Sequence, residues 1–324
     1  MVERLVANEK VEGSIPFARS INMFKVITSI FQKYIDARDI RQFKKNFFYY
    51  IFFRLIRKKL TSKIKIKIYD FYVFASANKK KMSHSLLRKC DFEDTQEIKL
   101  IDSISKNFLI YLFDCGSNFG FYSLYIASKN KDNKVVAFEA SPTTFLEIQK
   151  NVEINNFVSI KINNLAVSNN ENLKLTFNES ENDWESSISH SDFENKSKIF
   201  IKSTTLDAVT KKQVFDDYAV IIKLDVEGHE MNVMDGSLSL IKKCSPLIIL
   251  EFSKFIRKDK FYNFSYLENF LVKFDYEIYN SKFQITSLEK VLAEINKLPN
   301  NMYGIGNNFL IKKGSKIENI IKNV

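Results

Sequence analysis

The sequence predicts an α/β protein with a doubly wound, mainly parallel sheet of seven strands, preceded by a helical extension at the N-terminus. Two observations support this prediction. Short apolar runs, typical of strands buried on both faces, alternate along the chain with segments of helical spacing. Several of these runs end in acids or glycines, and an open parallel sheet binds its ligands at that edge. With 324 residues, the chain is long enough for one large domain and an extension.

Seven segments are the expected strands of this sheet. Each is short, is rich in branched or aromatic residues, and is bounded by polar or turn residues. They are residues 109–113, 134–139, 159–162, 219–224, 246–250, 276–279 and 308–311. Helices are expected between them, and one begins at Pro142 because Ser141 is a good N-cap. Residues 173–203 are expected to form a hairpin-rich excursion, which is either a wall of the site or a surface insertion.

The first strand ends in Asp114 and leads into a loop that contains Gly116, Asn118 and Gly120. A dinucleotide fold requires Gly-x-Gly-x-x-Gly, and a P-loop requires Lys-Ser/Thr after its last glycine. Neither pattern is present. Asp-x-Gly-x-x-x-Gly resembles motif I of the S-adenosylmethionine-dependent methyltransferases, whose ligand is cationic and lacks phosphate. The alternative is an ordinary strand-to-helix turn.

Further acids follow the later strands. Glu139 ends the second strand, about 20 residues after the glycine loop, where nucleotide-binding folds hydrogen-bond a ribose diol. Asp225, Glu227 and His229 follow the fourth strand, and Glu251 follows the fifth. Because parallel strands end at one edge of the sheet, these side chains are expected to form one site.

Residues 223–236 resemble a specific family. They contain Lys-x-Asp-x-Glu-Gly-x-Glu followed by a glycine, here Lys223, Asp225, Glu227, Gly228, Glu230 and Gly236. Together with the Asp-x-Gly-x-Asn-x-Gly loop and Glu139, residues 106–252 resemble the FkbM-type methyltransferases. Ala140 stands where that family often has proline. The resemblance implies a class I, Rossmann-like methyltransferase that uses S-adenosylmethionine to methylate a hydroxyl of a sugar, a glycan or a similar small molecule.

The resemblance also implies roles for individual residues. The cofactor site would comprise Asp114, Gly116, Asn118, Gly120, Glu139 and Ala166. Asp225, Glu227 and His229 would be catalytic, and Lys223 and Glu251 would bind the substrate. The base is Asp225 or His229, because histidine titrates near neutral pH whereas aspartate needs burial to raise its pKa. We assign no metal ion, although these carboxylates would also suit a divalent cation.

Other functions are open to this sequence. The main alternative is a non-catalytic membrane-surface or scaffold protein with a degenerate methyltransferase fold. A nicotinamide oxidoreductase is disfavoured by the missing third glycine. No nucleic acid is expected as a partner, because the Asn/Asp-Pro-Pro-Tyr/Phe segment that holds a flipped base is absent after the fourth strand.

The formal net charge of +11 indicates an acidic partner, and residues 24–67 are rich in both basic and aromatic residues. Their apolar run is too short to span a bilayer, which needs about 20 residues. Such a segment either lies on an anionic membrane or packs on the domain with its lysines in water. Cys90, Cys115 and Cys244 lack disulfide or zinc spacing, so we expect reduced thiols and a cytoplasmic protein, peripheral to the membrane in the first case.

The expected domain boundaries follow from these patterns. Residues 1–22 are a disordered or spurious extension, because VEGSIPFARS resembles a translated transfer-RNA gene and Met23 would then be the start. Residues 23–62 form the basic aromatic helical segment. Residues 63–314 form the methyltransferase-like domain, and residues 315–324 form a C-terminal tail.

Overall fold

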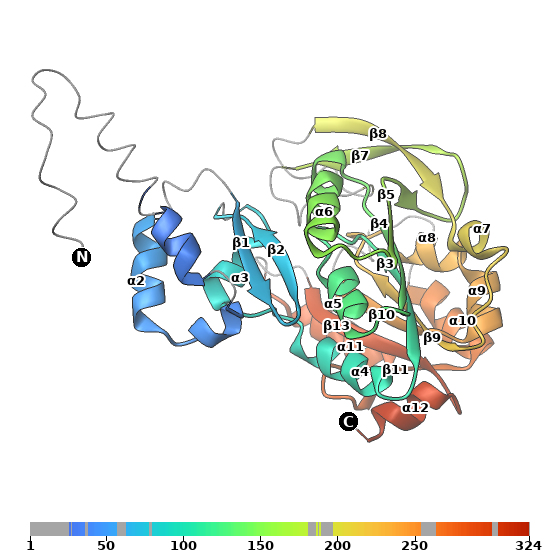
Figure 1. Cartoon of the computed structure of the whole chain (residues 1–324). Coiled ribbons are helices and arrows are strands. Elements are labelled where there is room, and N and C mark those ends of the chain that lie inside the picture. The colour runs from blue at the N-terminus through green and yellow to red at the C-terminus, as the bar shows by residue number, and fades with distance from the viewer. Residues whose placement is uncertain are drawn as a thin grey trace, which may run out of the picture.

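The computed structural model describes residue 26 and residues 28–35, 38–56, 63–77, 80–180, 186, 188, 197–253, 264–299 and 304–323. A large α/β unit is flanked by a smaller layer formed by the N-terminal part of the described chain (Figure 1). Residues 1–22, Trp184 and His190 lie outside the described residues.

A twisted central sheet organises the α/β unit, and its strand order is β12-β11-β13-β10-β9-β3-β4-β5. The strands are β3 (Leu109–Cys115), β4 (Lys134–Phe138), β5 (Ile160–Asn163), β9 (Tyr218–Leu224), β10 (Leu247–Ser253), β11 (Tyr276–Tyr279), β12 (Ile285–Thr286) and β13 (Gly304–Lys312). The five strands from β10 to β5 are parallel, and β13 runs antiparallel to both β10 and β11. The predicted mainly parallel fold is therefore confirmed. The sheet has one strand more than the seven predicted, because β12 is too short to show a periodic pattern.

Helices cover both faces of the sheet, as the doubly wound prediction requires. Alternate residues of β3 enter different cores: Ile110 and Leu112 belong to one cluster, and Tyr111 and Phe113 belong to the other. The first core is covered by α4 (Thr95–Ser105), α5 (Phe121–Lys129) and α12 (Lys316–Ile321). The second is covered by α7 (Leu206–Thr210), α8 (Glu230–Asp235), α9 (Leu238–Cys244), α10 (Phe264–Phe274) and α11 (Leu288–Lys297).

Helix α6 (Pro142–Asn155) begins as the sequence predicts. Ser141 has extended backbone angles, and its hydroxyl accepts a hydrogen bond from the Thr144 N–H at 3.2 Å. Pro142 occupies the first helical turn, where no hydrogen-bond donor is needed. This cap fixes where the chain turns after β4, next to Glu139.

A three-stranded sheet lies beside the carboxyl edge of the central sheet (Figure 1). Its order is β6 (Ala166–Val167), β8 (Ser197–Thr204) and β7 (Lys174–Glu179). The antiparallel pair β7–β8 confirms the hairpin expected within residues 173–203.

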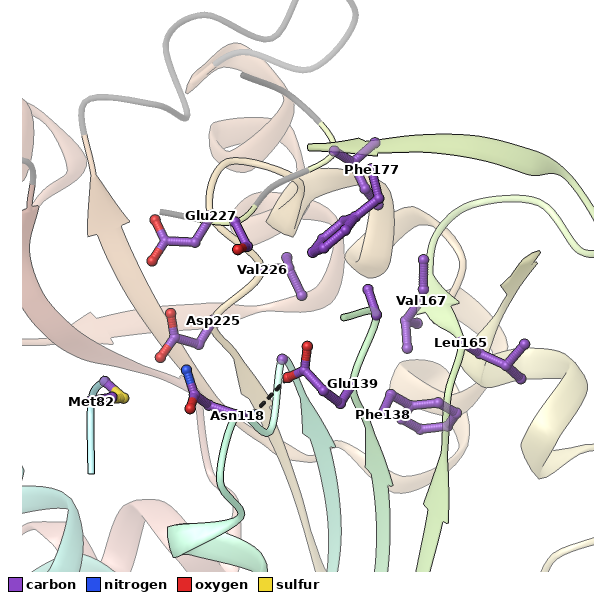
Figure 2. A pocket seen from close by; sticks show the side chains of 15 residues that line it. Met82, Asn118, Phe138, Glu139, Leu165, Val167, Phe177, Asp225, Val226 and Glu227 are labelled. Atoms are coloured by element: carbon purple, nitrogen blue, oxygen red, sulfur yellow. Dashed lines mark hydrogen bonds between the residues drawn. The ribbon is translucent and has the colours of Figure 1, made fainter. Parts of the chain in front are cut away.

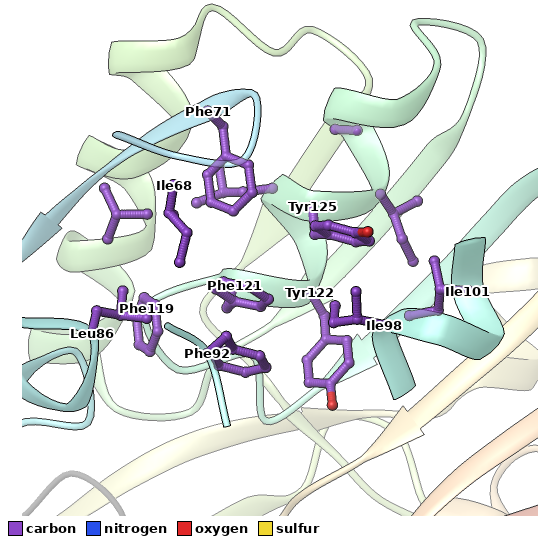
Figure 3. Close-up of a cluster of buried hydrophobic side chains, with 14 of the residues drawn as sticks. Ile68, Phe71, Leu86, Phe92, Ile98, Ile101, Phe119, Phe121, Tyr122 and Tyr125 are labelled. Atoms are coloured by element: carbon purple, nitrogen blue, oxygen red, sulfur yellow. The ribbon is translucent and has the colours of Figure 1, made fainter. Parts of the chain in front are cut away.

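The N-terminal layer contains a helical segment at 28–35, the 3-10 helix η2 (Ile40–Phe43), α2 (Phe47–Ile56), the hairpin β1 (Ile64–Ile68)–β2 (Phe71–Ala75) and α3 (His84–Lys89). The hairpin is joined to α6 by side chains: Asn155 Oδ1 accepts from the Tyr72 N–H at 2.7 Å, and Asn151 Oδ1 accepts from the Phe74 N–H at 2.9 Å. Aromatic rings from β2, α5 and the α3–α4 connection fill the space between the layer and the α/β unit (Figure 3).

Residues 316–321, expected above as part of a C-terminal tail, form helix α12. Ile317 and Ile321 are buried in the first core, which explains why the segment is helical. Cys90, Cys115 and Cys244 are free thiols, in keeping with the sequence prediction. Among the described residues, no helix has the length and apolar character needed to cross a membrane.

Candidate functional site

A pocket opens at the carboxyl edge of the central sheet, where the turns after β3, β4 and β9 meet β6 and β7. The carboxylates of Asp225 and Glu227 lie on one side of it, and Leu165, Val167 and Phe177 lie on the other (Figure 2). Asn118 and Glu139 lie between the two sides. Acids that are distant in the sequence are thus brought to one edge, as expected for a parallel sheet.

The glycine loop after β3 is shaped by close contacts. Gly116 has a φ of +80°, and a Cβ there would lie 1.9 Å from the backbone oxygen of Asp225. Gly120 has a φ of +89°, and a Cβ there would lie 2.6 Å from Cγ1 of Ile148. Both positions therefore require glycine. Gly116 and Asn118 line the pocket, whereas Gly120 packs against α6.

Glu139 lines the pocket and is oriented by backbone groups. Its Oε2 accepts from the Asn118 N–H at 2.8 Å, and its Oε1 accepts from the Ser141 N–H at 2.9 Å. Each carboxylate oxygen has a second lone pair. Glu139, which the sequence predicts to bind the ribose, therefore lies beside the glycine loop with both carboxylate oxygens held by backbone donors.

Asp114 lies beneath the pocket rather than in its lining. It is buried and accepts a hydrogen bond from the Ser123 hydroxyl of α5 at 2.6 Å. Burial raises the pKa of Asp114 to about 6. The structure therefore places this residue as a support for the start of α5 and not in direct contact with the cavity. Ala166 does line the pocket, as predicted.

The apolar side of the pocket contains side chains that the sequence analysis did not select. Phe138, Leu165, Val167 and Phe177 line it, and Ser186 and Ile188 follow Phe177 along the chain. Phe177 comes from β7 of the small sheet and is buried. Its only sequence signal is its place in the 173–203 excursion, whose role as a wall was one of two alternatives.

The acidic side consists of Asp225 and Glu227 from the turn after β9, with Glu251 of β10 beside them. One oxygen from each of these three carboxylates lies within 4.8 Å of the others. Burial, followed by the charge of Asp225, raises the pKa of Glu227 and of Glu251 well above the usual value. Glu227 also has a φ of +53°, so its position depends on a backbone conformation that side chains rarely adopt.

Lys223 is the cation of this cluster and is buried beneath it, at 1% exposure. Its Nζ lies 3.2 Å from Oδ2 of Asp225. Burial alone would lower the pKa of Lys223, but the charges of Asp225, Asp94 and Glu251 raise it above the ordinary value. Lys223 is therefore a permanent positive charge that holds Asp225 in place, and it does not line the pocket.

Asp94 belongs to the same cluster, because its charge acts on Lys223, and it was missed from the sequence. It stands at the N-cap position of α4, but its side chain does not cap the helix. Instead, its Oδ2 accepts a hydrogen bond from the Tyr122 hydroxyl at 2.6 Å, and burial raises the pKa of its carboxyl. No local pattern connects Asp94 to the acids after β9, so only the fold reveals this contact.

His229 lies outside the pocket lining. It is buried at the start of α8, and its Nε2 is 3.0 Å from the Ser168 hydroxyl. The same serine is close to Gly236, where a Cβ would lie 2.0 Å from the Ser168 backbone oxygen. The structure therefore places His229 at the contact between α8 and the residues after β6, outside the pocket lining.

The carboxylates of the acidic side also form the group of donors that could hold a metal ion. A hard divalent cation prefers such oxygen ligands. Lys223 already supplies a positive charge at Asp225, and the sequence analysis assigned no metal ion to these carboxylates.

Fold and site together define a class. A parallel sheet with a glycine loop after one strand, an acid after the next, and an acidic turn opposite them is the arrangement of the methyltransferases predicted above. The methyltransferase FkbM domain model matches residues 114–278, just over half of the chain. The chain therefore belongs to this family.

Individual relatives are distant. "Methyltransferase 1" of Beauveria bassiana (strain ARSEF 2860) is 26% identical over 144 residues, which cover 39% of this chain and 57% of that protein. Similar solved structures include methyltransferase FkbM from Methylobacillus flagellatus KT, with 15% identity, a TM-score of 0.34 and coverage of 62% of this chain and 51% of that one. Another is M. jannaschii TYW2 in complex with AdoMet, with 12% identity, a TM-score of 0.37 and coverage of 78% and 87%.

Proposed function

We propose that this protein is an S-adenosylmethionine-dependent O-methyltransferase that acts on a hydroxyl of a sugar, a glycan or a similar small molecule. One observation supports the proposal most directly. Glu139, at the end of β4, and the pair Asp225 and Glu227, after β9, line a single pocket beside the glycine loop. Family membership supports the transfer of a methyl group.

The pocket suits this methyl donor in charge and shape. S-adenosylmethionine carries an ammonium and a sulfonium, and when bound it supplies a methyl group activated by the positive sulfur. Glu139 would accept hydrogen bonds from the ribose hydroxyls. The apolar side, with Leu165, Val167 and Phe177, would pack on the adenine ring. The acidic surroundings favour a cationic ligand, whereas a pyrophosphate would be repelled.

The acidic side would receive the acceptor hydroxyl. That oxygen must lose its proton as it is methylated, and a positioned base typically contributes about 10²–10⁴-fold. Glu227 is the best placed base, because it lines the pocket and its raised pKa makes it a stronger proton acceptor than an ordinary glutamate. Asp225 is held by Lys223, so we assign it to orienting the hydroxyl. His229, a base candidate from the sequence, lies outside the lining and gains no support.

The experiment that tests this function has two arms. Isothermal titration calorimetry with S-adenosylmethionine and with NAD should give binding of the first only. Incubation with donor labelled in its methyl group and a panel of sugars and glycans should then give a labelled ether. Binding of NAD would favour an oxidoreductase. Donor binding with no turnover across the panel would favour a non-catalytic protein with a degenerate methyltransferase fold.

A further inference from the structure

The N-terminal layer presents an exposed apolar helix face that the proposed function does not use. In α2, Phe47 is 70% exposed and Phe48 is 76% exposed, and Tyr50 and Ile51 are also exposed. On the other side of the same helix, Tyr49 and Phe53 are buried in the core. Phe47, Phe48, Tyr50 and Ile51 therefore form a separate outer face, which we call the α2 outer face.

Helix α2 is attached to the rest of the N-terminal layer through its inner side, so this attachment does not use the α2 outer face. The Tyr49 hydroxyl donates a hydrogen bond to the backbone oxygen of Leu87 in α3 at 2.7 Å. The Tyr49 ring also lies 5.7 Å from that of Phe31. With this attachment complete, helix α2 lies at the outer end of the N-terminal layer, away from the central sheet (Figure 1).

The charge around the α2 outer face is positive. Lys44 and Lys45 precede the helix, and Arg54 stands in its last turn. Lys44 forms an ion pair with Asp91. Within the described residues, Lys45 and Arg54 have no carboxylate at ion-pair distance, and both are exposed. Exposed phenylalanines with cations at both ends of one helix are the chemistry of a surface that enters an anionic lipid interface.

We propose that the α2 outer face docks the protein on an anionic phospholipid membrane. Phe47, Phe48 and Ile51 would enter the boundary between headgroups and acyl chains, and Lys45 and Arg54 would contact the lipid phosphates. Sequence analysis left two alternatives for residues 24–67, contact with a membrane and packing on the domain. In this proposal the first applies to the outer face of α2 and the second to its inner side. This inference goes beyond the proposed function and does not depend on it.

The docked helix is also connected to the pocket. Helix α3, whose Leu87 accepts the hydrogen bond from Tyr49, begins at His84, two residues after Met82, and Met82 lines the pocket. The ring of Phe53 lies 5.9 Å from that of His84, at the start of α3. Docking through α2 would therefore hold Met82, at the edge of the pocket, in a fixed relation to the membrane surface.

Vesicle co-sedimentation of the full chain tests this proposal. We expect binding to vesicles of phosphatidylcholine mixed with phosphatidylglycerol, little binding to phosphatidylcholine alone, and a steep decrease with added salt. Phe47→Ser combined with Phe48→Ser should weaken binding more than tenfold. Phe200→Ser is the matched control, because Phe200 is a 63% exposed phenylalanine on β8. It should bind as the original chain does.

The charge contribution has its own pair of variants. Lys45→Gln with Arg54→Gln should weaken binding about fivefold for each charge removed. Lys131→Gln with Lys134→Gln, at exposed positions before and at the start of β4, should leave binding unchanged. Circular dichroism and thermal unfolding would verify that every variant is folded.

Five outcomes would overturn the proposal. Equal binding to both vesicle types, or binding unaffected by Phe47→Ser with Phe48→Ser, would contradict it. If light scattering showed a change of oligomeric state in that double variant, the α2 outer face would be assigned to contact with a second copy of the chain. If only a chain that starts at Met23 bound the vesicles, residues 1–22 would be the occupant of the α2 outer face in the full chain. Binding of a single-stranded oligonucleotide with no vesicle binding would assign the face to nucleic acid.

Discussion

The two sides of the pocket are constructed in different ways. The proposed donor side is local: Gly116, Asn118, Glu139 and Ser141 come from two consecutive strand–helix connections, and the N–H groups of Asn118 and Ser141 donate to the Glu139 carboxylate. The proposed acceptor side is assembled from residues at α4, β9 and β10, and it gathers Asp94, Asp225, Glu227 and Glu251 around Lys223. The first fixes a carboxylate with backbone donors. The acceptor side holds several charged groups out of water, and this burial shifts the pKa values of its carboxylates.

The largest expected effect lies on the acceptor side. Glu227→Gln removes the proposed base with little change of shape, so turnover should fall about 10²–10⁴-fold. Donor affinity measured by calorimetry should stay within a few-fold of that of the original chain. Glu171→Gln, at an exposed position before β7, is the control and should leave both quantities unchanged. If Glu227→Gln also lost donor affinity, the donor and acceptor sides of the pocket would not have separate functions.

A substitution on the donor side should instead lower donor affinity and leave turnover at saturating donor nearly unchanged. Glu139→Gln places an amide NH2 against one of the two backbone N–H groups that now donate to the carboxylate. Hydrogen bonds to charged groups contribute about 1.5–3 kcal/mol, so calorimetry should show donor affinity reduced about 10–100-fold. Turnover at saturating donor should change much less. A loss of turnover that saturation does not restore would place Glu139 in the chemistry of the acceptor.

The smallest effect concerns stability and pH. Glu230, buried in the first turn of α8, accepts hydrogen bonds from the N–H groups of Val226 and Gly228, and burial raises its pKa to about 7. Because the native carboxyl binds its proton more tightly than that of the unfolded chain, its contribution to stability is full at low pH. That contribution is lost as the pH rises through about 7.

Glu230→Gln keeps an oxygen for both donors and removes the charge. Urea unfolding should show the variant to be more stable than the original chain by about 1–3 kcal/mol at alkaline pH. The difference should vanish at a pH near the ordinary glutamate pKa. Glu171→Gln should show no such pH dependence. A difference that is constant with pH would contradict the buried, titrating carboxylate.

The same contrast explains what could be predicted from the sequence. The donor side depends on short-range signals, so the Gly116 loop, the Ser141 cap and the position of Glu139 are all confirmed in place. Asp94 is separated from Asp225 by many elements, and Phe177 reaches the pocket from another sheet. No local pattern marks either residue. His229 has suitable chemistry, but packing against Ser168 directs it elsewhere.

The close approach of Gly116 to Asp225 has a consequence for how ligands interact. The Asp225 N–H donates to the backbone oxygen of Cys115 at 3.1 Å, so the loop after β3 and the turn after β9 are in direct contact at their first residues. A movement of the loop after β3 must therefore also move the turn after β9, and the reverse. Occupancy by one ligand should therefore change the affinity for its partner, and thermodynamic linkage requires the same factor in both directions.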